Sequence, residues 1–226
     1  MLTFYYHPLS PVARRVWLAL LEKNIVFELR LVDLKAREHL KPDYLTIHPF
    51  HHVPAIVDQN LRLIESFAIL DYLEAKFPEL PLSPTEPDAI DHMKMVQRVI
   101  ANDLAPKLPH LALLANDDFR VDERTLKHFK AVCTFLEEQL GSSIYFGGDR
   151  MSLADITVGT VLPLMRRLGI NLQPYPTLMQ WCDRVSSRPA WQQTEPNHHD
   201  LQAWQRWISL MVKRHQRNQA RALTAY

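Results

Sequence analysis

The sequence predicts a small α/β domain followed by an all-helical domain, and two observations support this fold class. Runs typical of β-strands lie almost entirely before residue 65 of the 226-residue chain, whereas helix-period patterns dominate after it. Between the two parts runs the segment FPELPLSPTEPDA, whose four prolines, Pro78, Pro81, Pro84 and Pro87, cannot continue a helix. The predicted boundaries are residues 1–79 for the first domain, 80–88 for a linker and 89–226 for the helical domain.

The first domain begins with a β-α-β pattern. Leu2–Tyr6, LTFYY, is typical of a strand, and Val12–Lys23 carries apolar residues at helical spacing. Val26–Val32, VFELRLV, alternates between apolar and polar residues, as a half-buried strand does. This order favours two parallel strands joined by a crossover helix.

A hairpin and a second helix complete the predicted first domain. Pro54–Val57 and Leu61–Ile64 are short apolar runs on either side of Asp58-Gln59-Asn60, which has the composition of a turn. Ser66–Phe77 then places its apolar residues along one helical face. The domain therefore reads β-α-β, a loop, and β-β-α.

The second domain is predicted to be helical, apart from a short run at Ile144–Phe146 that is compatible with a strand. Five helices are expected, over Ala89–Leu104, Glu123–Leu140, Leu153–Leu168, Thr177–Ser187 and Leu201–Arg217. Ser152 and Asp155 have the spacing of a capping box, which indicates a helix start rather than catalysis. The two cysteines, Cys133 and Cys182, lie in apolar helical runs, so we expect buried free thiols and a reducing compartment.

Charge and composition narrow the classes of function. The formal net charge of +1 at pH 7 provides no bulk attraction to nucleic acid or to an anionic membrane. The chain starts with a strand pattern rather than a signal peptide, and no apolar run is long enough to span a bilayer, so we expect a cytoplasmic protein. No metal site is predicted, because the clustered histidines lack carboxylate or cysteine neighbours at ligand spacing. These histidines are His48, His51, His52, His198 and His199.

Three short segments place polar groups at the boundaries between elements. In HPLSPVARRVWLAL, Ser10 and Pro11 precede a helical run, a pattern typical of a helix N-cap. Val53-Pro54 precedes a strand, and on local grounds this bond is expected to be trans, because only about 5–6% of X–Pro bonds are cis. At Glu65-Ser66 a strand gives way to a helix, so Ser66 is either an N-cap or part of an anion site at the helix N-terminus.

The order of these motifs resembles that of cytosolic glutathione transferases over almost the whole chain, from Met1 to Trp191. The sequence that carries the resemblance is HPLSPVARRV, EHLKPDYLTIHPFHHVPAIV, LIESFAILDYL, the proline linker, GGDRMSLADITVG and RVSSRPAW. The first domain is most similar to the serine-type classes, the phi class above all. The resemblance implies a thioredoxin-like first domain with a mixed four-stranded sheet that binds glutathione, followed by an all-α domain.

The resemblance also implies a catalytic role for Ser10, whose hydroxyl would donate a hydrogen bond to the glutathione sulfur. Only the thiolate attacks an electrophile, and a free thiol has a pKa of about 8.5. A hydrogen bond to the charged form lowers that pKa. Tyr5 and Tyr6 are rival candidates for this role, because other classes of the family use a tyrosine near the end of the first strand. Local packing is the alternative role for both tyrosines.

Six further residues match glutathione-binding positions of the family: His39, His52, Val53, Pro54, Glu65 and Ser66. The backbone of Val53, before a cis-proline, would pair with the cysteinyl part, and Glu65 with Ser66 would hold the γ-glutamyl end. His39 and His52 would contact the glycyl end. Here the chain departs from the family pattern, since Leu40 replaces a common lysine, His51 a usual glycine, and His52 a glutamine or lysine.

The electrophile pocket would lie between the domains. Its candidate lining residues are Leu9, Val12, Ile100, Leu104, Leu108, Leu111, Trp204 and Trp207. An apolar stripe at helical spacing is also what a buried core requires, so a core role is the alternative for these residues.

Taken as implied by the resemblance, the protein is a glutathione transferase that adds glutathione to small electrophiles in detoxification. Glutathione is then a co-substrate, no cofactor is bound permanently, and the enzyme is a homodimer with a glutathione-dependent peroxidase side activity. One alternative is a non-catalytic glutathione-binding or scaffold protein of the same fold. The other is a thiol–disulfide oxidoreductase, against which the absence of cysteine from residues 1–80 argues.

Overall fold

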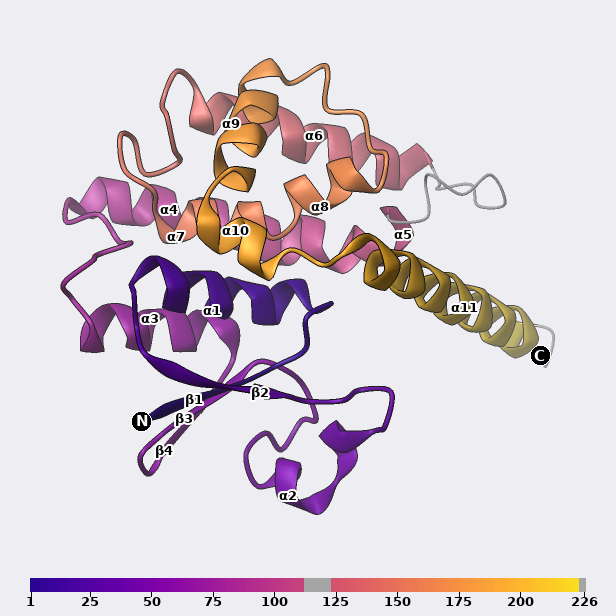
Figure 1. Ribbon diagram of the computed structural model, residues 1–226. Coiled ribbons are helices and arrows are strands. Elements are labelled where there is room, and N and C mark those ends of the chain that lie inside the picture. The colour runs from indigo at the N-terminus through magenta and orange to yellow at the C-terminus, as the bar shows by residue number, and fades with distance from the viewer. Residues whose placement is uncertain (112–122, 224–226) are drawn as a thin grey trace.

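The computed structural model describes residues 1–111 and 123–223, with side chains described as far as Val212. The chain forms two parts, one built on a sheet and one built of helices (Figure 1). A sheet with its two helices forms the first part, and a cluster of helices lies against those two helices. The predicted fold class, an α/β domain followed by a helical domain, is confirmed.

The sheet has four strands in the order β2-β1-β3-β4. The strands are β1 (Leu2–Tyr6), β2 (Phe27–Leu31), β3 (Ala55–Asp58) and β4 (Leu61–Ile64). β1 pairs in parallel with β2 and antiparallel with β3, which forms a hairpin with β4. The mixed sheet is thus as predicted, and the hairpin turn is only Gln59-Asn60, with Gln59 at a φ of +56°.

Helices α1 (Pro11–Glu22) and α3 (Ser66–Lys76) cover the face of the sheet that looks toward the second domain (Figure 1). Their apolar faces are fully buried, because they are covered by the sheet on one side and by the helical domain on the other. The loop after β2 contains a 3-10 turn, η1 (Glu38–Leu40), and a single-turn helix, α2 (Pro42–Leu45). Neither was predicted, since elements this short leave no periodic pattern.

The predicted linker is held in place by polar contacts. The Glu74 carboxylate of α3 accepts hydrogen bonds from the backbone N–H groups of Leu82 and Ser83 at 3.0 and 2.9 Å. Lys23 Nζ donates to Glu74 Oε1 at 2.7 Å and to the Leu80 carbonyl at 2.9 Å. These hydrogen bonds fix the linker against the C-terminal ends of α1 and α3.

The second domain is helical in the part that the structure describes. Its elements are α4 (Pro87–Val99), the π-helical η2 (Ile100–Leu104), the 3-10 turn η3 (Ala105–Lys107), α5 (Leu108–Leu111), α6 (Glu123–Leu140), α7 (Leu153–Gly159), α8 (Leu162–Arg167), α9 (Pro176–Ser186), α10 (Pro189–Thr194) and α11 (His198–Leu223). The bounds of α6 are those predicted. The run Ile144–Phe146 is not a strand and takes part only in an isolated bridge between Tyr145 and Gly148.

The prediction of one continuous helix over Leu153–Leu168 is wrong. The chain breaks between α7 and α8, because Pro163 has no N–H to donate to the carbonyl of Gly159. That carbonyl accepts instead from Trp191 Nε1 of α10 at 3.3 Å. Gly159 is required by this close approach, since a Cβ there would lie 2.9 Å from the Trp191 ring.

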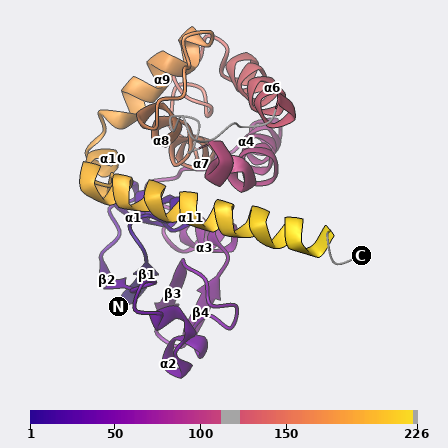
Figure 2. The same ribbon diagram turned by 90° about the vertical axis from the view of Figure 1, so that its right-hand side faces the viewer.

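Helix α11 leaves α10, crosses the junction of the two domains and projects beyond the body of the molecule (Figures 1 and 2). One face is buried by Leu201, Trp204, Ile208 and Val212, and the other exposes Trp207, Leu210 and Met211. Within the described residues, no helix combines the length and apolar character needed to cross a membrane.

Candidate functional site

Ser10 begins α1 at the edge of the junction between the two domains. Its Oγ accepts a hydrogen bond from the Ala13 N–H at 3.2 Å, so Ser10 is the N-cap that the local sequence predicts. Pro11 occupies the first turn, where its missing N–H costs nothing. The cap interaction uses a lone pair of the hydroxyl oxygen and leaves the hydroxyl proton for another acceptor. Ser10 is half-buried, so that proton is within reach of a ligand.

The first turns of α1 favour an anion next to Ser10. The first turn contains no acidic residue, and the free N–H groups of a helix N-terminus carry partial positive charge. Arg14 and Arg15 follow, both buried. Burial lowers the pKa of each guanidinium to about 10, which leaves both charged at neutral pH. A thiolate placed at Ser10 therefore lies at the positive end of a helix that also carries two buried cations.

Tyr5 and Tyr6 both have packing partners, on opposite faces of the sheet. The Tyr6 ring lies 4.7 Å from the Trp17 ring of α1, and burial raises the pKa of Tyr6. The Tyr5 ring lies 6.0 Å from that of Tyr44 in α2. This alternation is what a strand imposes, and a raised pKa makes Tyr6 a weaker proton donor to a thiolate. The geometry favours Ser10.

Val53 and Pro54 lie immediately before β3, an inner strand of the sheet. The Val53–Pro54 peptide bond is cis, as the family resemblance implies and against the preference for trans derived from the dipeptide alone. The strand ladder of β3 begins only at Ala55, so the Val53 backbone lies outside the sheet pairing. Tyr44 Oη donates to the His52 carbonyl at 2.6 Å and holds the preceding peptide. Sequence reasoning missed this role of Tyr44, because its partner lies in a different element.

Glu65 and Ser66 lie at the start of α3. Glu65 is the N-cap residue, with φ at +68°, a conformation that residues other than glycine adopt at a cost of about 1–3 kcal/mol. Ser66 is the first helical residue and is buried, so the reading of Ser66 as an N-cap is wrong. Backbone strain of this kind gathers at ligand sites, which agrees with the role the resemblance gives to this pair.

Histidines surround the predicted glycyl end of the site. His48 is buried, and its ring centre lies 5.6 Å from that of His52. Burial, together with the neighbouring His51, Arg37 and His52, lowers the pKa of His39, whose buried Nδ1 has no hydrogen-bond partner. His51 replaces the glycine usual in the family and adopts φ of +56°, the left-handed conformation that glycine favours. Among the described residues no group of three or more His, Cys, Asp or Glu side chains is arranged to hold a metal ion.

The predicted pocket residues separate into two sets. Ile100, Leu104, Leu108, Leu111 and Trp204 are buried in the common core. Leu9 is half-buried next to Ser10, while Val12 and Trp207 are exposed. Asp200, near the start of α11, acts electrostatically on His7 in the loop before Ser10. The start of α11 therefore lies close to the loop that precedes Ser10, and the exposed Trp207 lies about two turns further along α11.

A cavity of about 300 Å³ lies elsewhere, within the second domain. It is lined by Leu126, Phe129, Lys130, Gly169, Ile170, Asn171, Pro174 and Tyr175. None of these residues belongs to the first domain, so an electrophile bound there would not meet a thiolate at Ser10. The thiols of Cys133 and Cys182 are buried, and burial raises the pKa of each to about 12, so neither is a nucleophile at neutral pH.

Comparisons with known proteins agree with the geometry. A family model for the N-terminal domain of glutathione S-transferases matches residues 4–81, and one for the C-terminal domain matches residues 99–189. Glutathione S-transferase F9 from Arabidopsis thaliana is 32% identical over 206 residues, which cover 84% of this chain and 94% of that protein.

Solved structures give the same result. The crystal structure of glutathione transferase F7 from Populus trichocarpa has a TM-score of 0.72 at 27% identity, covering 86% of this chain and 97% of its own. The structure of a glutathione S-transferase-I bound with lactoylglutathione has a TM-score of 0.73 at 25% identity, covering 85% and 97%. With both domain models matched in order and relatives aligned over most of its length, the chain belongs to the glutathione S-transferase family.

Proposed function

We propose that the protein is a serine-type glutathione transferase in which the Ser10 hydroxyl stabilises the glutathione thiolate. The observation that carries this proposal is that Ser10 Oγ accepts a hydrogen bond from the Ala13 N–H, which occupies one lone pair and leaves the hydroxyl proton available at a positively charged helix end. A hydrogen bond to the thiolate lowers the thiol pKa. Each pKa unit corresponds to about 1.4 kcal/mol of stabilisation of the thiolate relative to the thiol.

The proposed reaction is a nucleophilic addition or substitution at carbon. The bound thiol loses its proton to solvent, and the sulfur forms a C–S bond with the electrophile. An aryl halide then releases halide ion, whereas an isothiocyanate takes up a proton at nitrogen. With a hydroperoxide the sulfur attacks the terminal oxygen, the O–O bond breaks, and the alcohol leaves after taking up a proton, so that the sulfur becomes a sulfenic acid. A second glutathione then attacks this sulfur to form the disulfide and releases water; this is the peroxidase side activity.

Glutathione would bind along the edge of the first domain as a short extra strand. The Val53 backbone, which lies just before β3 and outside its ladder, would pair with the cysteinyl residue and would direct its sulfur toward Ser10. Ser66 and the N-terminus of α3 would hold the γ-glutamyl carboxylate. His39 and His52 would meet the glycyl carboxylate. Glutathione is a co-substrate in this proposal. The lactoylglutathione bound to the related structure is a derivative of glutathione with an acyl group on its sulfur.

The electrophile would bind between the first turn of α1 and α11, against Leu9, Val12 and Trp207. The fully buried Ile100, Leu104 and Leu111, with Leu108 and Trp204, would form the floor behind this surface. We further propose a homodimer in the cytoplasm, by analogy with the family.

The rival function is a glutathione carrier without turnover. The proposal is tested by conjugation of glutathione to an aryl halide, an isothiocyanate and a hydroperoxide, with the bound thiol titrated by thiolate absorbance. Wild type is compared with Ser10→Ala and with Ser152→Ala, which removes a serine cap far from the site. We expect turnover, with loss of rate and a raised thiol pKa in Ser10→Ala alone. Binding of glutathione without turnover in wild type would establish the carrier; equal rates in all three proteins would remove Ser10 from the mechanism.

A further inference from the structure

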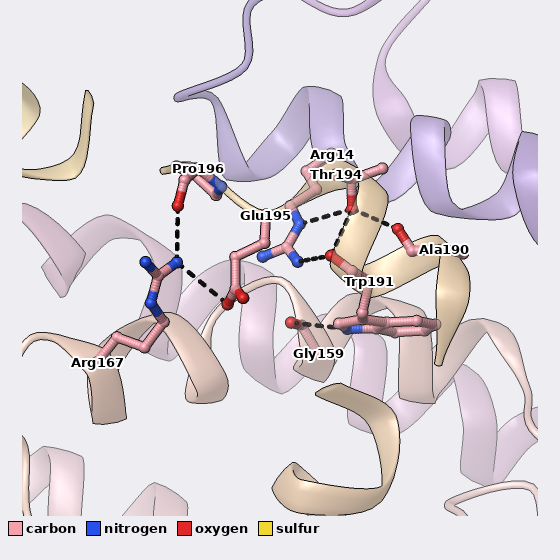
Figure 3. A network of polar contacts seen from close by, with 8 residues as sticks. All are labelled: Arg14, Gly159, Arg167, Ala190, Trp191, Thr194, Glu195 and Pro196. Carbon is pink, nitrogen blue, oxygen red and sulfur yellow. Dashed lines mark hydrogen bonds and ion pairs between the residues drawn. The ribbon is translucent and has the colours of Figure 1, made fainter. Parts of the chain in front are cut away.

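Arg14 connects the catalytic end of α1 to the second domain. Its side chain is buried, with 4% of its surface exposed. Its Nε donates to Thr194 Oγ1 at 3.1 Å and its Nη2 donates to the Trp191 carbonyl at 3.2 Å (Figure 3). Both acceptors belong to α10, and Thr194 lies 180 residues further along the chain. The neighbouring Glu195 carboxylate adds a favourable charge.

The acceptors of Arg14 are themselves held in place. Trp191 is buried and its Nε1 donates to the Gly159 carbonyl of α7 at 3.3 Å (Figure 3). Thr194 Oγ1 donates in turn to the Ala190 carbonyl at 2.9 Å. Arg14 therefore contacts a rigid part of the second domain rather than a loop that can follow it.

The segment after α10 is fixed by the same cluster. Arg167 of α8 donates to the Pro196 carbonyl at 2.9 Å and pairs with Glu195 at 3.1 Å (Figure 3). This segment leads directly into α11. The start of α11 and the first turns of α1 are thus held by two arginines, one from each domain.

The coupling from Arg14 to Ser10 is short. The Arg14 N–H donates to the Ser10 carbonyl at 2.9 Å, which is the first hydrogen bond of the α1 helix. Arg14 thus holds Ser10 through its backbone and α10 through its guanidinium. A small rotation of this turn would redirect the Ser10 hydroxyl, and hydrogen-bond strength depends on that direction.

We propose that Arg14 is a positioning residue for thiol activation: its paired hydrogen bonds to α10 make the orientation of Ser10 depend on the second domain. The guanidinium suits this role because its planar, always charged fork engages two acceptors at once. The inference rests on the proposed function of Ser10 and adds the residue that aligns it.

The other end of α1 supplies a matched control. Glu22, in the last turn of α1, accepts from Arg188 Nε at 2.9 Å and from its Nη2 at 2.5 Å. This pair also joins the two domains and raises the pKa of Arg188. It lies about three turns of helix from Ser10, so it tests interdomain contact without touching the catalytic end.

The experiment compares Arg14→Lys, Thr194→Val, Thr194→Ser and Glu22→Gln in the full-length protein. Thr194→Val removes one of the two acceptors of the Arg14 guanidinium while keeping the shape of the side chain, and Thr194→Ser restores the hydroxyl. The readouts are the pKa of bound glutathione from thiolate absorbance, kcat and KM for the conjugation reaction, and the unfolding midpoint of each variant.

We expect the thiol pKa to rise by about 0.5–1 unit in Arg14→Lys and in Thr194→Val, with about 3–10-fold less thiolate below the pKa. kcat should fall with it while KM for glutathione stays within about twofold, as for an interaction made only in the activated state. Thr194→Ser should return to the wild-type pKa, and Glu22→Gln should keep that pKa even where it lowers the unfolding midpoint.

A wild-type thiol pKa and kcat in Thr194→Val would overturn the inference, and so would an equal shift in Glu22→Gln, which would indicate a general loss of stability. In either case a raised thiol pKa in Ser10→Ala would leave the proposed function standing. If wild type itself shows no lowered thiol pKa, the proposed function fails and the inference fails with it.

Discussion

Ser10 and Ser152 both cap helices in this protein, but their surroundings differ. Ser10 begins α1 at the junction of the domains, and Ser152 begins α7 in the middle of the second domain. Ser152 Oγ accepts from the Ala154 N–H at 3.2 Å and donates to Asp155 Oδ2 at 2.9 Å. Ser152 and Asp155 are both buried. Ser10 makes the same kind of cap with Ala13, but it is half-buried.

The difference lies in what remains for a ligand. Asp155 accepts from the Ser152 N–H at 2.8 Å, the Phe146 N–H at 2.9 Å and Trp181 Nε1 at 2.8 Å, so the polar groups around Ser152 have partners. That cluster joins α7, α9 and the loop before α7. A cap saturated by internal partners stabilises a fold, whereas a cap whose proton faces a ligand can do chemistry as well.

The largest effect expected concerns the saturated cap. Asp155→Ala would leave four buried donors without their acceptor: the N–H groups of Ser152 and Phe146, the Ser152 hydroxyl and Trp181 Nε1. We therefore expect the free energy of unfolding to fall by about 3–5 kcal/mol. Urea denaturation measures this loss. The thiol pKa of glutathione bound to the folded fraction should stay that of wild type. A loss below about 1 kcal/mol would show that the two caps are less different than their contacts indicate.

The next largest effect is expected at the other cap, Ser10, where catalysis rather than stability should change. Ser10→Ala should lower kcat for conjugation by about 10–100-fold, because a hydrogen bond to a charged group contributes roughly 1.5–3 kcal/mol. Its free energy of unfolding should fall by only about 0.5–1 kcal/mol, the value of a single half-buried cap. Steady-state kinetics and urea denaturation on the same preparation compare the two. If Ser10→Ala lost much of its free energy of unfolding and kept the wild-type kcat, Ser10 would be a structural cap like Ser152.

Ser152→Ala makes the same substitution as Ser10→Ala at the other capping serine. The same atom is removed as in Ser10→Ala, but here we expect about 1–2 kcal/mol lost from the free energy of unfolding and no change in kcat or thiol pKa. Denaturation and kinetics are again the measurements. Any fall in kcat at a temperature where the variant is fully folded would mean that the second cap also supports the site.

The smallest effect concerns His39, at the end of the site remote from Ser10. Burial and nearby cations lower the pKa of His39, so its contribution to the stability of the ligand-free protein is present above about pH 6.5 and is lost as pH falls through the lowered pKa. A bound carboxylate opposes that shift and raises the pKa again. Binding of S-methylglutathione, which has no thiol to titrate, should therefore tighten by about 2–5-fold between pH 8 and pH 6.

Calorimetry of wild type and His39→Gln measures this dependence. The variant should bind with little change across the same range. A pH dependence that survives in His39→Gln would assign it to His52 or to another group, and would separate the glycyl end from the role given to His39.

Much of the fold was predictable because its signals are local. Each correctly predicted element shows a pattern within a few neighbouring residues. Examples are the strand Leu2–Tyr6, the hairpin around Gln59-Asn60 and the helix Glu123–Leu140. The break between α7 and α8 was not foreseen, although Pro163 signals it locally. The helical pattern continues across the break, and only Trp191 shows where the freed carbonyl finds its donor.

The candidate site was predictable from the order of its motifs rather than from any single residue. Ser10 alone indicates a cap, and Val53-Pro54 alone favours trans, which is wrong here. The supporting residues were missed. Tyr44 and Arg14 carry no local signal for their roles, because each acts on a partner in another element.

The sequence by itself determined the types of most of the longer elements, the two-part division, the caps at Ser10 and Ser152, and the family through the spacing of its motifs. These depend on backbone geometry and on contacts between residues a few positions apart. The tertiary structure alone decided that the Ser152 cap is buried among internal partners while the Ser10 cap is half-buried, and that Arg14 meets Thr194 across 180 residues. Burial and long-range hydrogen bonds assign these roles, and both come into existence only when distant segments pack together.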